Sequence, residues 1–489
     1  MVNENTGGID AAINSVVAPA TEALSAFVFY SVRIGNAELP LIVAWLIAAA
    51  AFFTVYFGFI NLRGFAHAFR LLRGDYDDPE HRGEVNHFQA LATAVSGTVG
   101  IGNIGGVAVI ISLGGPGATF WLMLAGFLGM STKMAECMAG VKFRQVHADG
   151  SVSGGPMYYL EHAFRQRGLA PLAKPMGTFY ALAIVIGCFG IGNMFQSNQA
   201  YSQLVFITGG PTGMLGELGW LVGSLIAVAV GIVIIGGLRS IASVTVRLVP
   251  FMALAYIALS VLVLVLNAER LPWAINAIFT QAFAPEAMAG GTIGVMILGF
   301  QRAAFSNEAG IGSAAIAHAA VRTEEPATEG FVALMEPFID TVVICTMTAL
   351  VILTTIYEPD ISQGGIQGVE LTSAAFSSTL TWSSIPVSLI AVLFAFSTLI
   401  AWSYYGLKGW TYLVGEGRKR EMVFKGVFCL VCALGCTIEL SAVLDFADAM
   451  VFLIALPNII GLYLLAPDLK AELQSYRART SAVGVTKAT

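Results

Sequence analysis

The chain has 489 residues, of which 56% are hydrophobic and only 11% are charged, and its formal net charge is −6. Soluble domains carry roughly 25% charged residues, so this composition excludes an ordinary soluble protein, a coiled coil and a disordered chain. The 53 glycines fall largely inside apolar stretches, which membrane helices tolerate. The chain is therefore predicted to be a polytopic all-α membrane protein, and nothing in its charge pattern indicates nucleic-acid binding.

A helix needs about 20 apolar residues to cross a bilayer, and the chain contains several apolar segments of that length. The N-terminal ten residues lack the basic region of a cleavable signal, so the first span is expected to be retained. Segments 13–32 and 273–283 are too short or interrupted and are predicted to be amphipathic or interfacial. Eleven spans are predicted, at 40–62, 89–113, 117–140, 176–206, 219–238, 245–267, 291–320, 328–355, 386–410, 422–442 and 445–466.

The basic residues predict the orientation of these spans. Apart from Lys133 and Arg302, which lie inside spans, all Lys and Arg residues except Arg33 and Arg270 belong to loops of one parity. Positively charged loops stay in the cytoplasm. We therefore predict an inner cell membrane protein with an extracytoplasmic N-terminal segment, residues 1–39, and a cytoplasmic tail, residues 468–489.

An internal repeat relates two of the spans. Span 2 contains Gly-Ile-Gly at 100–102 and span 7 contains it again at 310–312. Five spans separate the two starts, so the repeated segments run in opposite directions. This predicts a five-plus-five inverted repeat, with residues 89–268 (spans 2–6) and 291–467 (spans 7–11) as its halves and span 1, residues 40–62, as an addition in front.

Both repeated segments are poor continuous helices. Glycine costs about 1 kcal/mol relative to alanine at a helix interior, and the polar residues Ser96, Thr98 and Asn103 lie among the glycines of span 2. Span 7 adds Arg302 and Glu308 at the same depth, where a charge costs at least about 2.5 kcal/mol. We predict that spans 2 and 7 are discontinuous and line a binding site. Close packing of small residues is the alternative explanation.

A dinucleotide fingerprint also occurs here but lacks its context. Residues 100–105 match GxGxxG, yet they lie inside a membrane span and no acid follows about 20 residues later. A phosphate-binding GxxxxGK motif is absent from the sequence as well, so we expect no dependence on ATP.

Four longer stretches carry a resemblance to a known family: NHFQALATAVSGTVGIGNIGGVA (87–108), GGPGATFWLMLAGFLGMSTKMAE (114–136), GNMFQSNQA (192–200) and FSNEAGIGSAAIAHAA (305–320). The sequence resembles the alanine/glycine:cation symporters, the sodium:alanine symporter family. That resemblance implies uptake of a small neutral amino acid with Na⁺ as the coupling ion, on the fold of the bacterial leucine transporter. It leaves open which amino acid and enantiomer is carried, and in what oligomeric state.

Chemistry assigns roles to the two interrupted segments. Half-helix N-termini present free N–H groups to a carboxylate, and unwound carbonyls suit an ammonium group or Na⁺. We assign the substrate carboxylate to the backbone at 98–102 and the ammonium group to carbonyls near Phe305 and Ser306, with Phe305 as a wall that favours small substrates. The predicted substrate-binding residues are Gly97, Thr98, Gly100, Gly102, Asn103, Asn193, Gln196, Phe305, Ser306 and Asn307.

For Na⁺, oxygen ligands are required. Ser397 and Thr398 of span 9 resemble the hydroxyl pair that leucine-transporter-type proteins use. Carbonyls of Phe394, Gly97 and Gly100 complete the predicted shell. The alternative is that both hydroxyls bond to carbonyls of their own helix.

Several other polar residues lie inside predicted spans. The amides of Asn193, Gln196 and Asn198 could contact substrate or bond neighbouring helices together. Arg302 and Glu308 are expected to form an ion pair that holds the broken helix. Asp340 is a candidate for gating or for a structural role.

The inner halves of the spans also carry ionisable residues. Lys133 and Glu136 are explained by snorkelling or pairing, and His318 is assigned no proton-relay role because it lies near the cytoplasmic end of span 7. Coupling to H⁺ through Glu308 or Asp340 remains the alternative to Na⁺. The sequence shows no nucleophile–base pair of an enzyme.

Overall fold

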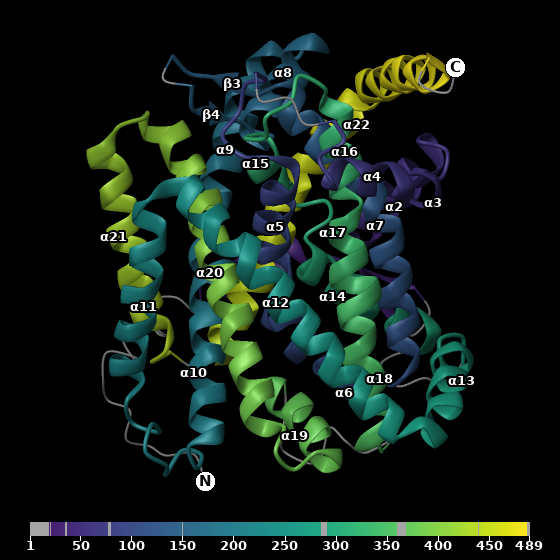
Figure 1. Cartoon of the computed structure of the whole chain (residues 1–489), viewed down its shortest axis with the longest axis vertical. Coiled ribbons are helices and arrows are strands. Elements are labelled where there is room, and N and C mark those ends of the chain that lie inside the picture. The colour runs from purple at the N-terminus through teal and green to yellow at the C-terminus, as the bar shows by residue number, and fades with distance from the viewer. Residues whose placement is uncertain are drawn as a thin grey trace.

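The computed structural model describes most of the chain as a bundle of helices (Figure 1). The described residues are 19, 21–34, 37–76, 80–148, 150–284, 291–358, 368–438 and 440–486. The first part of the predicted N-terminal amphipathic segment, residues 13–18, lies outside them.

The first half of the chain precedes the segment 285–290. Two short strands and then three helices lie ahead of its first interrupted span. Its elements are β1 (Ser31–Ile34), β2 (Ala37–Pro40), α2 (Leu41–Tyr56), α3 (Ile60–Arg63), α4 (Phe65–Leu72), α5 (His87–Thr98), η1 (Gly102–Gly106), α6 (Val107–Gly114), α7 (Gly117–Lys142), β3 (Gln145–Val146), β4 (Val152–Ser153), α8 (Pro156–Gln166), α9 (Ala170–Phe189), η2 (Gly190–Met194), α10 (Phe195–Ile207), α11 (Gly219–Ile235), α12 (Gly237–Leu266), η3 (Ala268–Arg270) and α13 (Leu271–Gln281). The strands pair β1 with β2 and β3 with β4, both antiparallel.

The second half repeats much of this order of elements. It consists of α14 (Gly291–Asn307), α15 (Ser313–His318), α16 (Pro326–Ala333), α17 (Met335–Pro337), η4 (Phe338–Cys345), α18 (Thr346–Thr355), α19 (Val369–Thr379), α20 (Ser384–Val414), α21 (Arg418–Gly435) and α22 (Leu440–Thr486). Counted from α5 and from α14, each half begins with an interrupted helix, and a short helix, α8 or α19, precedes its third long segment. These two short helices lie at opposite ends of the bundle (Figure 1).

Several helices have the length and composition of membrane spans. Among the described residues, five helical stretches qualify, and the bent pair α5 and α6 adds a sixth if it counts as one span. The other predicted spans coincide with α2, α7, α11, α14 and α21, which do not meet the same test. The number of eleven spans therefore remains a prediction.

The first interruption lies between α5 and α6. Helix α5 begins with a capping box, in which the Asn86 side chain accepts from the Gln89 backbone and the Gln89 side chain accepts from the Asn86 backbone. The helix ends at Thr98, and the axis then bends by 51° into the second part of the span. The short π-helix η1 carries three glycines, which weaken regular helix structure at this point.

The second interruption separates α14 from α15. Glu308, Gly310 and Gly312 all adopt positive φ values, of 56°, 99° and 84°. This region of φ is costly for a side chain such as that of Glu308, so the surrounding structure must hold it. Both predicted breaks are therefore present as interruptions of the helical backbone.

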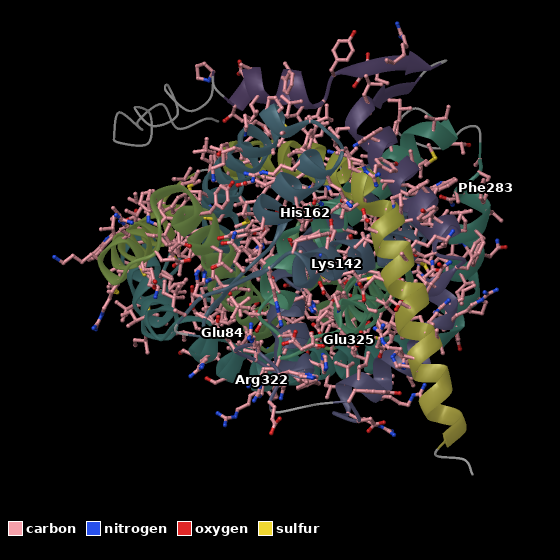
Figure 2. All side chains as sticks on the ribbon, turned by 90° about the horizontal axis from the view of Figure 1, so that it is seen from above. Glu84, Lys142, His162, Phe283, Arg322 and Glu325 are labelled. Carbon is pink, nitrogen blue, oxygen red and sulfur yellow. The ribbon has the colours of Figure 1, made fainter. Side chains whose placement is uncertain are left out.

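The last helix extends beyond its predicted span. Instead of ending near residue 466, α22 continues past Pro467 to Thr486 and crosses one end of the bundle (Figure 2). There Lys142 donates to Glu472 at 2.5 Å, and Arg479 pairs with Glu325. Most of the predicted tail is thus helical and attached to the bundle.

Candidate substrate and cation site

The two interruptions lie against each other in the middle of the bundle. A Cβ atom placed on Gly102 of η1 would lie 3.5 Å from the Phe305 ring and 3.9 Å from the Ser306 Cα atom of α14. These distances correspond to direct van der Waals contact between η1 and the end of α14. The segments that the sequence repeat singled out are therefore neighbours in space.

Asp340 of η4 connects these two segments. Its Oδ1 atom accepts a hydrogen bond from Asn103 Nδ2 at 2.5 Å, and its Oδ2 atom accepts one from Ser306 Oγ at 2.8 Å. The hydroxyl of Thr341 donates to the same Oδ2 atom at 2.7 Å. Asp340, which sequence reasoning left as a gating or structural candidate, thus belongs to the candidate site.

The Asp340 carboxylate is fully buried, with an exposed fraction of 0%. None of the ion pairs found between described residues includes it. A buried carboxylate without a counter-charge is costly, and three hydrogen-bond donors offset only part of that cost. The oxygen atoms around it suit a hard cation. Asp340 also lies in a π-helix, a form that is frequent at functional sites.

The remaining predicted residues of span 2 have definite partners. Thr98 Oγ1 donates to the Val95 carbonyl at 3.3 Å, so its hydroxyl bonds within its own helix. The Gly100 N–H donates to Asn103 Oδ1 at 2.8 Å, which stabilises the bend. A Cβ atom on Gly97 would lie 2.9 Å from the Tyr405 hydroxyl oxygen. Asn103 therefore has a double role, since its oxygen holds the bend and its nitrogen reaches Asp340.

The predicted Na⁺ hydroxyls of α20 lie beside span 2. Ser397 Oγ donates to the Phe394 carbonyl at 2.9 Å, and Thr398 Oγ1 donates to the same carbonyl at 3.1 Å. Both hydroxyls thus make the helix-internal bonds of the alternative interpretation. They also face span 2, because Ser96 Oγ donates to the Ser397 carbonyl at 2.6 Å and a Cβ atom on Gly100 would lie 2.6 Å from Thr398 Oγ1.

The three amides of span 4 divide between two roles. Gln196 lies beside the break, where its Oε1 atom accepts from the Ile101 N–H at 3.4 Å. Asn193 instead donates from Nδ2 to the Phe428 carbonyl of α21 at 2.8 Å, and Asn198 donates to the Ile438 carbonyl at 2.6 Å. The nitrogens of Asn193 and Asn198 therefore bond helices together, away from the break. Of the three amides, Gln196 is the one that bonds to the interrupted segment among the described residues.

The predicted residues of span 7 form the other wall. Asn307 Nδ2 donates to Thr341 Oγ1 at 2.9 Å, and its Oδ1 atom accepts from the Ala309 N–H at 3.0 Å, which stabilises the start of the break. The Phe305 ring packs edge-on against Phe195, with 5.6 Å between centroids.

The expected ion pair between Arg302 and Glu308 is wrong. Arg302 pairs with Asp448 of α22, 3.2 Å away. Glu308 turns the other way, because the helix is interrupted at this residue, and accepts hydrogen bonds from Trp402 Nε1 at 2.9 Å and from the Ser313 hydroxyl.

Trp402 is the second site residue that sequence reasoning missed. Its side chain is fully buried, and a Cβ atom on Gly192 of η2 would lie 2.0 Å from it. Gly192 therefore makes room for the indole ring between spans 4, 7 and 9. Two features of the sequence could have indicated this contact. Trp402 lies deep within its predicted span, and the GNMF stretch begins with the glycine at position 192.

The fold and family are those of a membrane transporter. The structure is similar to that of MhsT in complex with L-phenylalanine, with a TM-score of 0.54, 14% sequence identity, and coverage of 80% of this chain and 98% of that one. The pattern of the sodium:alanine symporter family matches residues 26–488, and the chain belongs to this family. It is accordingly a multi-pass membrane protein that transports amino acids.

Two curated relatives illustrate the range of the family. The chain is 36% identical to the sodium/alanine symporter AgcS of Methanococcus maripaludis over 438 residues, which cover 89% of this chain and 94% of that protein. It is 30% identical to the probable sodium/glutamine symporter GlnT of Bacillus subtilis over 445 residues, or 90% of this chain and 89% of that protein.

Proposed function

We propose that this protein takes up small neutral amino acids, such as alanine and glycine, together with Na⁺ by alternating access. The observation that carries the proposal is the buried Asp340 carboxylate, which bonds to Asn103 of one interrupted span and Ser306 of the other. A cation bound there would bring both interrupted spans and the substrate together. The similarity to AgcS, a sodium/alanine symporter, and to GlnT, a probable sodium/glutamine symporter, supports the same activity.

The substrate binds between the two interruptions in this proposal. Its carboxylate meets the free N–H groups of residues 98–102, and its ammonium group meets the carbonyls near Phe305 and Ser306, assisted by Asn307. Phe305 lies close to Gly102, and Trp402 fills the space next to Gly192. In this proposal the two rings restrict the substrate to small side chains, which is the reason for favouring alanine and glycine.

Na⁺ is favoured over H⁺ because oxygen atoms converge at two places. Asp340 is one. The other lies between span 2 and α20, where the hydroxyls of Ser397 and Thr398 meet the Phe394 carbonyl and Thr398 lies against Gly100. In this proposal the carbonyls of Gly97 and Gly100 complete the shell. Both hydroxyls can turn from the Phe394 carbonyl to a cation, since a hydroxyl is both donor and acceptor.

The proposal includes the topology predicted from the sequence. Eleven spans with a five-plus-five inverted repeat are consistent with the similar order in which the elements follow one another in the two halves. The end of the bundle that carries α8 and the chain's C-terminus (Figure 1) is assigned to the cytoplasm, and the N-terminus to the outside of the inner membrane. The basic residues Lys142 and Arg322, labelled in Figure 2, are assigned to the cytoplasmic end in this proposal, as the charge rule requires.

Uptake by purified protein in liposomes tests the coupling ion. We expect an inward Na⁺ gradient at equal pH on both sides to drive radiolabelled alanine to a level above equilibrium, and a proton gradient without Na⁺ to leave it at equilibrium. Accumulation driven by the proton gradient alone would contradict the Na⁺ assignment and favour H⁺ coupling.

Ser397→Ala tests the second cation position. We expect the Na⁺ concentration for half-maximal uptake to rise about tenfold, the effect of losing about 1.4 kcal/mol of binding, while alanine affinity at saturating Na⁺ stays unchanged. The control is Ser403→Ala on the same helix, because Ser403 Oγ donates to the Ile400 carbonyl of its own helix. An unchanged Na⁺ activation curve for Ser397→Ala would remove Ser397 from the site.

A further inference from the structure

A second group of ionisable side chains lies beyond the candidate site, toward the assigned cytoplasmic end. All of its members are at least 98% buried, and the side chain of His318 is enclosed by protein. Of the two explanations expected for Lys133, snorkelling or pairing, the structure shows pairing, with Glu336. The group, here called the buried cluster, comprises His87, Lys133, Glu136, Glu308, His318, Glu329 and Glu336.

Direct contacts join most members of the buried cluster. His318 lies between two carboxylates, with Nε2 2.6 Å from Glu336 Oε1 and Nδ1 bonded to Glu329 Oε2. The other oxygen of Glu329 bonds to His87 of α5. Lys133 Nζ lies 3.5 Å from Glu336 Oε2 and donates to the Glu308 carbonyl at 3.3 Å. The cluster therefore connects α5, α7, α15, α16 and α17 to the break in span 7.

The contacts of His318 require a proton in addition to that of a neutral imidazole. A neutral ring has one N–H donor and one acceptor nitrogen, whereas both nitrogens of His318 face carboxylate oxygens. Either His318 is doubly protonated or one of its two partners is a carboxylic acid. In either case, the cluster holds at least one proton more than a neutral His318 ring and two carboxylates would carry.

Charge balance calls for one more proton. The four carboxylates outnumber the three bases Lys133, His87 and His318 by one, even when both histidines are charged. A net charge in this surrounding is costly. Three of the four carboxylates already have partners. Glu308, Glu329 and Glu336 each have hydrogen bonds or ion pairs at both carboxylate oxygens, which leaves Glu136 as the carboxylate that needs the additional proton.

Among the described residues, Glu136 is the only one of the four with a carboxylate oxygen that has neither a hydrogen bond nor an ion pair; Glu336 Oε2 also lacks a hydrogen bond but lies 3.5 Å from Lys133 Nζ. The Oε1 atom of Glu136 accepts from Asn458 Nδ2 at 2.8 Å, but its Oε2 atom, which is buried, has no hydrogen-bond partner among the described residues. Asn458 also donates to the Gly310 carbonyl at 2.8 Å, so Glu136 is one bond away from the hinge of span 7.

We propose that the buried cluster is a proton-binding site whose exchangeable proton resides on the Glu136 carboxyl, and that transport requires the protonated form. Proton loss leaves a carboxylate that competes with Glu336 and the Glu308 carbonyl for the Lys133 ammonium. The contact that holds the interrupted backbone at Glu308 is then weakened. The ligand is H⁺, and its site is separate from the substrate and Na⁺ positions.

Groups from every element around Glu136 contribute to its surroundings. The titratable groups that interact electrostatically with Glu136 are Lys133 and Cys137 of its own helix α7, Tyr159 of α8, Tyr180 of α9 and Glu336 of α17. Glu308, His318 and Glu329 also belong to the surrounding cluster. Of these groups, Lys133 and His318 can carry a positive charge, and only the charge of Lys133 does not depend on protonation of a histidine ring.

The test measures Na⁺-driven alanine uptake in liposomes with equal pH inside and outside, from about pH 6 to about pH 9. Wild-type uptake is expected to fall at the alkaline end, with a limiting slope of about tenfold per pH unit as one proton is lost. Glu136→Gln, which is neutral at every pH, is expected to keep its uptake there, and Glu136→Asp to retain the fall. The control Glu421→Gln removes a partly exposed carboxylate beside Lys425 and should behave as wild type.

Parallel pH profiles of the wild type and Glu136→Gln would overturn the proposal, as would a wild-type profile that is flat. Infrared spectroscopy of the wild type supplies a readout that needs neither the variant nor transport. A carboxylic-acid band should disappear between neutral and alkaline pH, and its absence at neutral pH would equally overturn the proposal. Because that band does not depend on Na⁺-coupled uptake, its presence without any alanine uptake would count against the proposed function alone.

Discussion

Asp340→Asn is expected to lower Na⁺ affinity by about 10- to 100-fold and to abolish accumulation of alanine at ordinary Na⁺ concentrations. Each charged contact contributes about 1.5–3 kcal/mol, and 1.4 kcal/mol corresponds to a factor of ten in affinity. The amide keeps the size of the carboxylate but loses its charge and one acceptor. Na⁺ activation of alanine uptake in liposomes measures the effect.

The matched control for this variant is Asp445→Asn. Asp445 is an exposed aspartate of α22, and its replacement removes the same charge outside the site. Folding of both variants is checked by their elution as single species in detergent. If correctly folded Asp340→Asn responds to Na⁺ as the wild type does, Asp340 is a structural residue and the first cation position is wrong.

Gly100→Ala is expected to reduce uptake by about tenfold or more. The added methyl group would lie 2.6 Å from Thr398 Oγ1 and 3.2 Å from Gln196 Oε1, so it displaces the hydroxyl that is proposed to bind Na⁺. Overpacking of this kind costs about 1–3 kcal/mol. The expected signature is a raised Na⁺ requirement together with the lower rate.

Gly106→Ala in the same span provides the comparison. A Cβ atom on Gly106 meets no atom within 4 Å, and alanine favours helix by about 1 kcal/mol relative to glycine. It should therefore retain uptake close to that of the wild type. Equal losses in both variants would mean that any alanine in this segment stiffens a backbone that must move, and the specific role of Thr398 would be refuted.

The sequence was informative about the interrupted segments because their chemistry is local. Glycines and small polar residues within a few positions weaken a helix wherever it packs, so the breaks near Gly102 and Gly310 could be predicted. Close approach of two breaks also follows from their repetition at the same depth. The helix-internal bonds of Ser397 and Thr398 were likewise foreseeable, since hydroxyls commonly bond to their own helix.

The partners of charged residues were not predictable in the same way. Asp340 reaches Asn103 across 237 positions of the chain, and Arg302 reaches Asp448 across 146. Such pairings depend on how helices pack and on the direction of each side chain, which no spacing rule supplies. The local pair of Arg302 and Glu308 failed because the break rotates Glu308 away, toward Trp402.

A structure determined with alanine and Na⁺ bound is the most direct test of the central claim. We expect the amino acid between residues 98–102 and 305–307, with its carboxylate toward the former, and Na⁺ within about 2.5 Å of oxygen atoms, the range expected for hard cations. An amino acid bound elsewhere in the bundle, with both interruptions closed against each other, would contradict the account.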